Sequence, residues 1–210
     1  MDNQLTVATN NFLLNESAMK NLVAISSYLA KSPITPKEYY GNVGSCLIAC
    51  DMAVRTNLSL LMVMQQLAIV NGRPTWSGQA CRALIDQSRR YDKPLKVVFV
   101  GEKGTNGWGA YAVAYRDGEE FRGTTVTMEM VKQEGWDRPK GTMVSKWVTM
   151  PEQMFKYRAA TFFAREHCPD ILMGCTVEGE AEDIARVEAT QFQTIEEQDA
   201  ADEMNEQLGL

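Results

Sequence analysis

The sequence predicts an α+β fold in which helices pack with a small antiparallel sheet and a β-hairpin. Helical periodicity dominates the first third of the chain and its last structured segment. An Asn-Gly turn signal at 71–72 follows a β-type run, and three strand-like segments follow one another in the middle of the chain. Helices and strands in separate runs indicate an α+β fold, because a parallel α/β sheet requires regular alternation of the two.

Apolar residues at spacings of three and four indicate helices in several segments. In chain order, these segments are 15–31, 44–55, 60–66, 76–90, 128–133 and 151–166. Asn15 is a favourable capping residue for the first helix, and Pro151 is favourable in the first turn of the last. Arg89 and Arg90 suit the negative end of the helix over 76–90.

The strand-like segments are 95–100, 108–116 and 121–126, which predict a three-stranded antiparallel sheet. Asp117-Gly118 can form the turn between the second strand and the third, since both residues tolerate positive φ. On the middle strand, alanine alternates with tyrosine and valine, so we expect small side chains on one face of the sheet and large side chains on the other. The glycine- and proline-containing stretch 135–145 is expected to be a loop.

Charge divides the chain into two parts. Residues 176–210 hold eleven acidic side chains and one basic one, a net charge of −10, whereas residues 1–175 carry a net charge of +4. We therefore expect a core over 1–175, with a loosely held arm at 1–14, and an acidic tail over 176–210 that is partly helical or disordered. The tail could screen a basic surface on the core or keep the protein soluble.

Several classes of chemistry find no support in the residues. The glycines of 101–107 do not fit a phosphate-binding loop that opens a helix, and no Gly-x-Ser-x-Gly motif is present. His167 is the one histidine, and with Cys168 and Cys175 it forms only a weak candidate metal site, because Cys-x-x-Cys spacing is missing. Cys46 and Cys50 are expected to be small buried apolar residues. We expect no enzymatic activity, no ATP use and no bound cofactor.

Basic side chains occur beside aromatic residues or glycines, a combination that suits a phosphate backbone and unpaired bases. Arg158 and Arg165 share one stripe of the last helix, and Lys140 and Lys146 precede Trp147. The sequence also allows a second interpretation, in which these basic side chains simply form ion pairs with the neighbouring acidic residues Glu152, Glu166 and Asp170. Trp147 and Tyr157 are expected to contribute to the core or to a subunit contact.

Three segments resemble the RecT/Red-beta family of phage single-strand DNA annealing proteins. They are Asn-Leu-Ser-Leu-Leu-Met-Val-Met-Gln at 57–65, Ile-Val-Asn-Gly-Arg-Pro-Thr-Trp-Ser-Gly-Gln-Ala at 69–80, and the segment 145–165, which runs from Ser-Lys-Trp-Val-Thr-Met-Pro through Phe-Lys-Tyr-Arg-Ala-Ala to Ala-Arg. The last of these is the most specific. The similarity extends from about Tyr39 to Gly174.

The resemblance implies a core related to the annealing-protein superfamily. It also implies ATP-independent binding of single-stranded DNA and annealing of complementary strands in phage recombination, by rings or helical filaments of subunits. DNA-contacting basic positions of the family map with most support to Lys146, Lys156, Arg158 and Arg165, and less securely to Arg116 and Lys140. Arg73 at the hairpin and Lys103 in the glycine loop complete the predicted DNA-binding set, on the ground of their place in the sequence and not of the resemblance.

The family further suggests a phage exonuclease or the host single-strand-binding protein as possible partners, and Mg²⁺ as no more than a modulator of DNA binding. Since no signal peptide or membrane span is evident, we expect the protein in the cytoplasm of the bacterial host. Two alternatives remain open. One is a self-assembling phage structural protein with no role on DNA. The other is a metal-dependent DNA nuclease using Asp117, Glu119 and Glu120.

Overall fold

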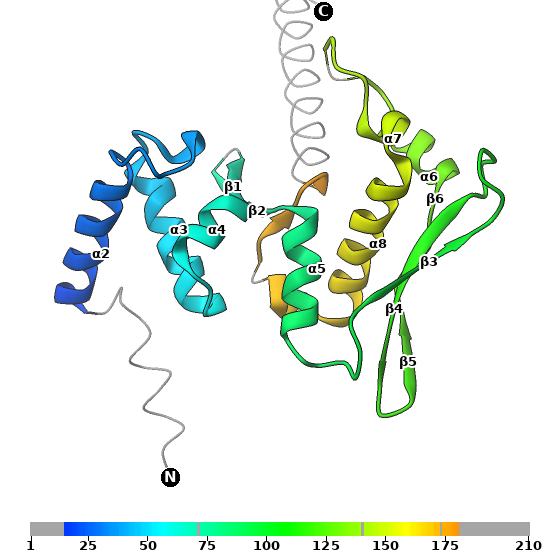
Figure 1. Cartoon of the computed structure of the whole chain (residues 1–210), viewed down its shortest axis with the longest axis horizontal. Coiled ribbons are helices and arrows are strands. Elements are labelled where there is room, and N and C mark those ends of the chain that lie inside the picture. The colour runs from blue at the N-terminus through cyan, green and yellow to red at the C-terminus, as the bar shows by residue number, and fades with distance from the viewer. Residues whose placement is uncertain (1–14, 71, 140, 173, 181–210) are drawn as a thin grey trace, which may run out of the picture. The chain divides into compact units, whose positions relative to one another are not determined.

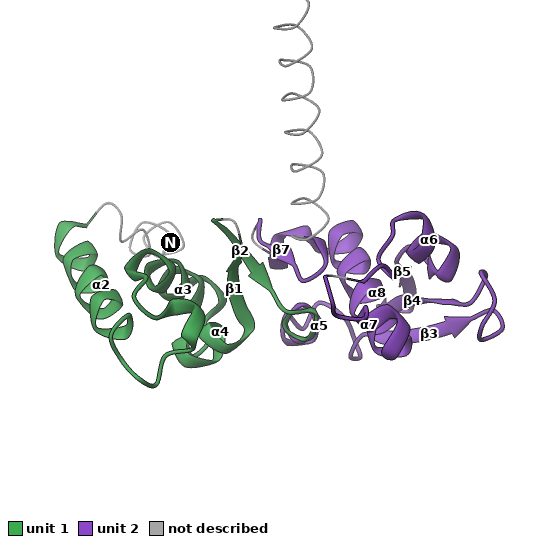
Figure 2. Ribbon diagram, turned by 90° about the horizontal axis from the view of Figure 1, so that it is seen from above, with its two compact units in different colours: residues 1–80 green, residues 81–210 purple. Residues whose placement is uncertain are grey.

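The computed structural model describes residues 15–70, 72–139, 141–172 and 174–180. The chain divides into two compact units, unit 1 at residues 1–80 and unit 2 at residues 81–210 (Figures 1 and 2). Small antiparallel sheets combine with helices, so the predicted α+β fold class is confirmed. The predicted arm at 1–14 and almost all of the predicted tail lie outside the described residues, and the limits proposed for the core stay a prediction.

From residue 16 to residue 66, unit 1 is mainly helical, as the periodicity predicted. Its helices are α2 (Glu16–Leu29), η2 (Lys37–Tyr39), α3 (Val43–Thr56) and α4 (Leu60–Gln66). The side chain of Asn15 accepts a hydrogen bond from the backbone N–H of Ala18 at 3.0 Å, and Asn42 caps α3 in the same way through Ser45. Both caps satisfy amide groups that the first turn of a helix leaves without partners.

A β-hairpin follows these helices directly. Strand β1 (Leu67–Val70) pairs antiparallel with β2 (Arg73–Trp76), with Val70 opposite Arg73. Gly72 has a φ of 75°, which glycine adopts readily, so the turn predicted from the Asn-Gly signal is confirmed at this residue. The hydroxyl of buried Tyr39 donates a hydrogen bond to the carbonyl of Leu67, which ties the hairpin to the helical layer.

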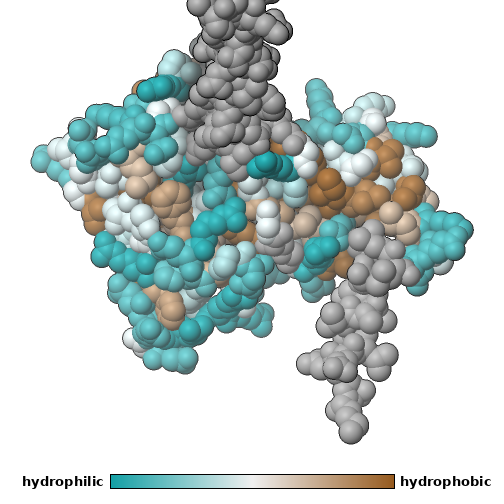
Figure 3. Space-filling view, turned by 180° about the vertical axis from the view of Figure 1, so that it is seen from behind, coloured by the Kyte–Doolittle hydropathy of each residue, from teal (hydrophilic) through white to brown (hydrophobic). Residues whose placement is uncertain are grey.

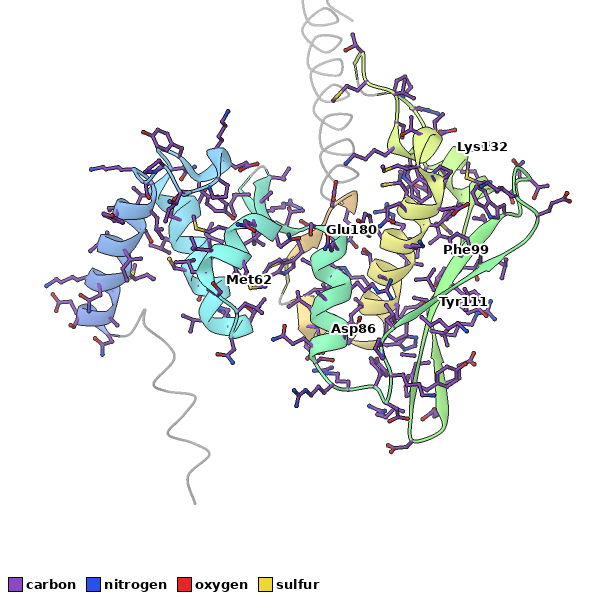
Figure 4. All side chains as sticks on the ribbon, viewed as in Figure 1. Met62, Asp86, Phe99, Tyr111, Lys132 and Glu180 are labelled. Atoms are coloured by element: carbon purple, nitrogen blue, oxygen red, sulfur yellow. The ribbon has the colours of Figure 1, made fainter. Side chains whose placement is uncertain are left out.

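Two cysteines and two methionines contribute to the core of unit 1. Cys46 and Cys50 are 0% and 5% exposed, as expected for small apolar side chains. Met64 is buried, but Met62 leaves 59% of its surface exposed (Figure 4). Unit 1 also exposes other large apolar side chains, and the space-filling view shows hydrophobic residues on the surface (Figure 3). The exposed large apolar side chains of unit 1, besides Met62, are those of Val23, Ile25, Tyr28, Ile34, Tyr40, Val54 and Leu61.

Unit 2 is built on a sheet and one long helix. Its elements are the end of α5 (Gly78–Gln87), β3 (Lys96–Val100), β4 (Gly109–Arg116), β5 (Glu119–Arg122), β6 (Val126–Thr127), α6 (Met128–Gln133), α7 (Lys146–Thr149), α8 (Pro151–His167), η3 (Pro169–Leu172) and β7 (Thr176–Val177). Strand β4 is central, because it pairs antiparallel with β3 on one side and with both β5 and β6 on the other.

The predicted third strand at 121–126 is wrong as a single element, because the structure divides it into β5 and β6. Gly123 lies between them, and its N–H donates to the carbonyl of Ala112 at 2.9 Å. A Cβ on Gly123 would lie 2.9 Å from the Cα of Phe163 in α8. The chain therefore bends where it passes closest to the helix, and regular strand pairing stops there.

Helix α8 packs along β4, and the small face of that strand makes the close approach possible. Ala110, Ala112 and Ala114 are at most 1% exposed. Ala110 belongs to an aromatic core in which the ring of Phe155 packs edge-on against Trp108 at 5.1 Å and against Trp147 at 5.2 Å. Trp147 is thus a core residue, which agrees with one of the two roles expected for it.

The predicted end of the helix at Arg90 is also wrong. Helix α5 stops at Gln87, and Arg89 adopts a left-handed φ of 52°. Instead of facing the helix end, Arg90 forms a two-pronged ion pair with Asp170, with one N–H···O distance of 2.8 Å. A partner 80 residues away therefore determines the place of this arginine.

No single helix in the described parts of the chain is long and apolar enough to cross a membrane. The bent pair of α3 and α4, with an angle of 115° between them, meets the length and composition criteria only when the two are taken together.

Candidate functional site

A pocket of about 510 Å³ lies in unit 2 between the N-terminal half of α8 and the segment 135–147. Its lining combines aromatic, basic and flexible apolar side chains. These are Trp136, Arg138, Met143, Val144, Lys146, Trp147, Met154, Tyr157 and Arg158, together with Gly179 and Glu178 from the segment after β7. Six of the fourteen lining residues come from the segment 145–165, which carries the most specific family resemblance.

Trp136 is held between a tryptophan and an arginine. Its ring stacks on Trp147 with the centroids 5.6 Å apart and an interplanar angle of 25°. The guanidinium carbon of Arg158 lies 3.8 Å from the centroid of the Trp136 ring. Arg158 is only 7% exposed, so its charge lies in the wall of the pocket rather than in bulk water. Stacking on an aromatic face favours arginine over lysine at such a position.

Lys146 is an exposed cation at the edge of the pocket, as is Arg138. It is the first residue of α7, whose capping residue Ser145 accepts a hydrogen bond from the N–H of Trp147 and donates one to the carbonyl of Trp136. The Lys146 ammonium lies 3.6 Å from a carboxylate oxygen of Glu178, and 65% of its side chain is exposed. The capped backbone of α7 thus places an exposed positive charge beside the aromatic wall of the pocket.

Arg165 lies two helical turns beyond Arg158 and has a carboxylate partner. Its guanidinium donates to both oxygens of Glu180, at 3.1 and 2.8 Å, and to the carbonyl of Cys175 at 2.8 Å. The hydrogen bond with Glu180 raises the pKa of Arg165 above its usual value. The two arginines share a face of α8 as predicted, but Arg158 is buried and Arg165 is only partly exposed.

The other predicted DNA-binding residues are dispersed. Lys103 lies in the loop after β3, 2.7 Å from Glu152 and 5.6 Å from the ring centroid of Trp108. Arg116, at the end of β4, lies over the ring of Phe121. Lys156 is a half-buried residue of α8, Arg73 is an exposed residue of β2 in unit 1, and Lys140 lies outside the described residues.

The second interpretation of the sequence, in which the basic residues pair with Glu152, Glu166 and Asp170, holds for only part of the predicted DNA-binding set. Glu152 pairs with Lys103, and the hydrogen bond from that lysine lowers the pKa of the carboxyl group. Asp170 pairs with Arg90, whereas Glu166 accepts hydrogen bonds from the backbone and hydroxyl of Thr124. Lys146 and Arg165 instead pair with Glu178 and Glu180, two carboxylates that this alternative did not include.

Several residues of the pocket were absent from the predicted site. Trp136 and Arg138 lie in the stretch predicted to be a loop, Tyr157 was assigned to packing, and Glu178 and Gly179 were assigned to the tail. Arg138 lies two positions before Lys140 in that predicted loop, and this closeness to a predicted DNA-binding lysine was a usable signal. Nothing local in the sequence indicates that Trp136 stacks on Arg158, because 22 positions separate the two residues.

Within the described residues, no three or more histidine, cysteine, aspartate or glutamate side chains come together to hold a metal ion. Asp117 and Gly118 both have positive φ, at 54° and 82°, as expected for the tight turn between β4 and β5. Glu120 accepts a hydrogen bond from the Tyr115 hydroxyl at 2.7 Å.

Comparison with known proteins identifies the family. The family model described as "RecT family" matches residues 18–196, which is most of the chain and includes the whole pocket. A search of the curated proteins gave no match, and a search of the solved structures gave none either. Membership of this family implies single-strand annealing in phage recombination, which is a binding activity rather than a covalent reaction. The chain belongs to the RecT family.

Proposed function

We propose that this protein binds single-stranded DNA and anneals it to a complementary strand without ATP, acting as an oligomer. The observation that carries the proposal is the pocket of unit 2. Exposed Lys146 and Arg138 there adjoin a wall built from Trp136, Trp147 and Arg158, inside the matched part of the chain. Cations in fixed positions suit backbone phosphates, and the adjoining aromatic and apolar surface suits the bases.

The residues have different roles in this proposal. Lys146, Arg138 and Lys156 neutralise phosphates, because their positions leave the charge wholly or partly exposed. Arg158 is a positioning residue that fixes Trp136 and adds positive potential to the pocket wall. Arg165 extends the same face along α8. Lys140, Arg116, Lys103 and Arg73 stay proposed outer contacts.

Such contacts read little sequence, since phosphate contacts position a strand without specifying its bases. Fidelity then comes from base pairing between the two strands. In this proposal annealing makes and breaks no covalent bond in the DNA, it uses neither ATP nor a metal cofactor, and Mg²⁺ acts by screening phosphates. A phage exonuclease or the host single-strand-binding protein is the proposed partner, in the cytoplasm of the host.

Exposed apolar residues support self-association into a ring or a filament. Met143 and Val144, which line the pocket, and Val148 and Met150, which follow them in the sequence, are between 47% and 69% exposed. Large apolar patches on a protein surface commonly mark interaction sites. Neighbouring subunits placed along one strand would then extend the phosphate-binding surface from one copy to the next.

Binding and mass measured together test this function. A dye-labelled single strand is titrated with the full chain, and light scattering gives the mass of the protein alone, with one strand and with two complementary strands. We expect binding, and annealing that is equally fast with and without ATP. A large particle that does not bind DNA would favour a structural protein, and strand loss in Mg²⁺ that a chelator stops would favour a nuclease.

A further inference from the structure

The short turn at 178–180 adds acidic groups to the basic surface of unit 2. Glu178 lies against Lys146, and Glu180 binds Arg165 through two hydrogen bonds. Between them Gly179, with a φ of 95°, lies so close to Arg158 that a Cβ there would be 3.0 Å from Nη1. Three consecutive residues thus lie against three of the basic side chains that we place on the DNA-binding surface.

The turn is held firmly in this position. A carboxylate oxygen of Glu180 also accepts a hydrogen bond from the backbone N–H of Val177 at 2.8 Å, and Val177 itself is fully buried. Only 19% of the Glu180 side chain is exposed, against 47% for Glu178. One carboxylate is therefore anchored and the other lies at the rim of the pocket.

Carboxylates and phosphates use the same partners. A carboxylate has two anionic oxygens and a backbone phosphate has two non-bridging ones, and both pairs accept charge-assisted hydrogen bonds from guanidinium and ammonium groups. On this basis the two glutamates occupy positions that the phosphates of a bound strand would take.

We propose that the turn at 178–180 is an internal competitor for DNA, which occupies the phosphate sites at Lys146 and Arg165 in the free protein and is displaced by the bound strand. The proposal rests on the proposed DNA-binding function. It also assigns the path of the strand, which runs along α8 from Lys146 past Arg158 to Arg165.

The chain carries this competitor at high effective concentration, because it is covalently attached to the surface that it covers. Residues 176–210 have a net charge of −10, so the turn begins the most acidic part of the sequence. DNA binding must overcome this local charge. Salt weakens the ion pairs that the turn makes with Lys146 and Arg165, as well as those that DNA makes with the protein. The competitor therefore has its greatest effect at low salt.

The decisive variant replaces both carboxylates in the full chain, as Glu178→Gln with Glu180→Gln. We expect it to bind a labelled poly-thymidine strand about three- to tenfold more tightly than the wild type at low salt, the range expected when two partly exposed ion pairs are released. The gain should shrink as salt is raised. Glu16→Gln with Glu38→Gln is the matched control, because it removes two exposed carboxylates on other elements, and its affinity should change much less.

Each outcome bears on one claim. Unchanged or weaker binding by the double variant, beside normal binding by the wild type, would overturn the competitor and leave Glu180 as a residue that positions Arg165. A failure of wild type and variant alike to bind any strand would instead overturn the proposed function. Should loss of the Val177 contact unfold the double variant, Glu178→Gln alone keeps that contact, and it must still bind more tightly than wild type.

Discussion

The guanidinium of Arg158 lies 3.8 Å from the centre of the Trp136 ring, and that ring stacks in turn on Trp147. This sequence of contacts joins the loop before α7 to the middle of α8. Arg158 is only 7% exposed, so these contacts hold a positive charge in a largely buried position. The same side chain lines the pocket that we propose receives DNA.

The first prediction concerns the stability supplied by Arg158. Arg158→Ala should lower the free energy of unfolding by about 2 kcal/mol, because a desolvated cation–π contact is lost and a buried side chain is removed. Arg158→Lys should recover only part of it, since an ammonium lacks the planar face. Urea denaturation measures both. Arg116→Ala, which removes an exposed arginine over Phe121, is the control and should cost less than about 1 kcal/mol.

The second prediction concerns Lys146, which is exposed and can be changed without disturbing the core. Lys146→Gln should weaken binding of a single strand uniformly across sequences and reduce the slope of log K against log salt by about one unit. Fluorescence anisotropy at several salt concentrations measures the slope. Lys96→Gln, an exposed lysine on β3, should leave it unchanged. Equal slopes for all three proteins would remove Lys146 from the phosphate contacts.

The third prediction tests the contact that divides β5 from β6. Gly123→Ala places a methyl group 2.9 Å from the Cα of Phe163, so the backbone of the sheet or of α8 must move. We expect the melting temperature to fall, with a cost of about 1–3 kcal/mol. Gly107→Ala has room, because its nearest atom would be 4.0 Å away, and it should melt close to the wild type. A normal melting temperature for Gly123→Ala would mean that the strand does not approach the helix this closely.

The fourth prediction concerns the thiols. All five cysteines are free and buried, and burial raises the pKa of Cys81 to about 12. The thiolate is the reactive form, so the native protein at pH 8 should resist alkylation at Cys81 while the unfolded protein reacts. Mass spectrometry after a short exposure to iodoacetamide counts the modified sites. Modification of native Cys81 at the rate of a free thiol would contradict its position in the core.

Local patterns in the sequence were sufficient for most of the helices. The apolar spacing at 60–66 and 128–133 matches α4 and α6 as they stand in the structure, and Asn15 and Ser77 cap the helices that follow them. These features depend on residues three or four positions apart, which periodicity and capping rules describe.

Distant contacts account for the errors. The third strand divides because Gly123 meets Phe163, 40 residues later, and α5 ends early while Arg90 finds Asp170. At the site, helical spacing placed Arg158 and Arg165 on one face. It could not indicate that Trp136 buries the first or that Glu180 pairs with the second, because both partners come from other segments of the chain.

The most direct test of the proposed function is the rate of annealing without ATP. Two complementary oligonucleotides, one with a fluorophore and one with a quencher, are mixed with the wild type, with Lys146→Gln/Lys156→Gln, and with Lys93→Gln/Lys96→Gln as a charge-matched control. We predict that the wild type and the control accelerate annealing equally, and that the Lys146/Lys156 variant is slower by about tenfold or more while remaining folded. An unaccelerated wild-type reaction, or a fully active Lys146/Lys156 variant, would contradict the assignment of this surface to DNA.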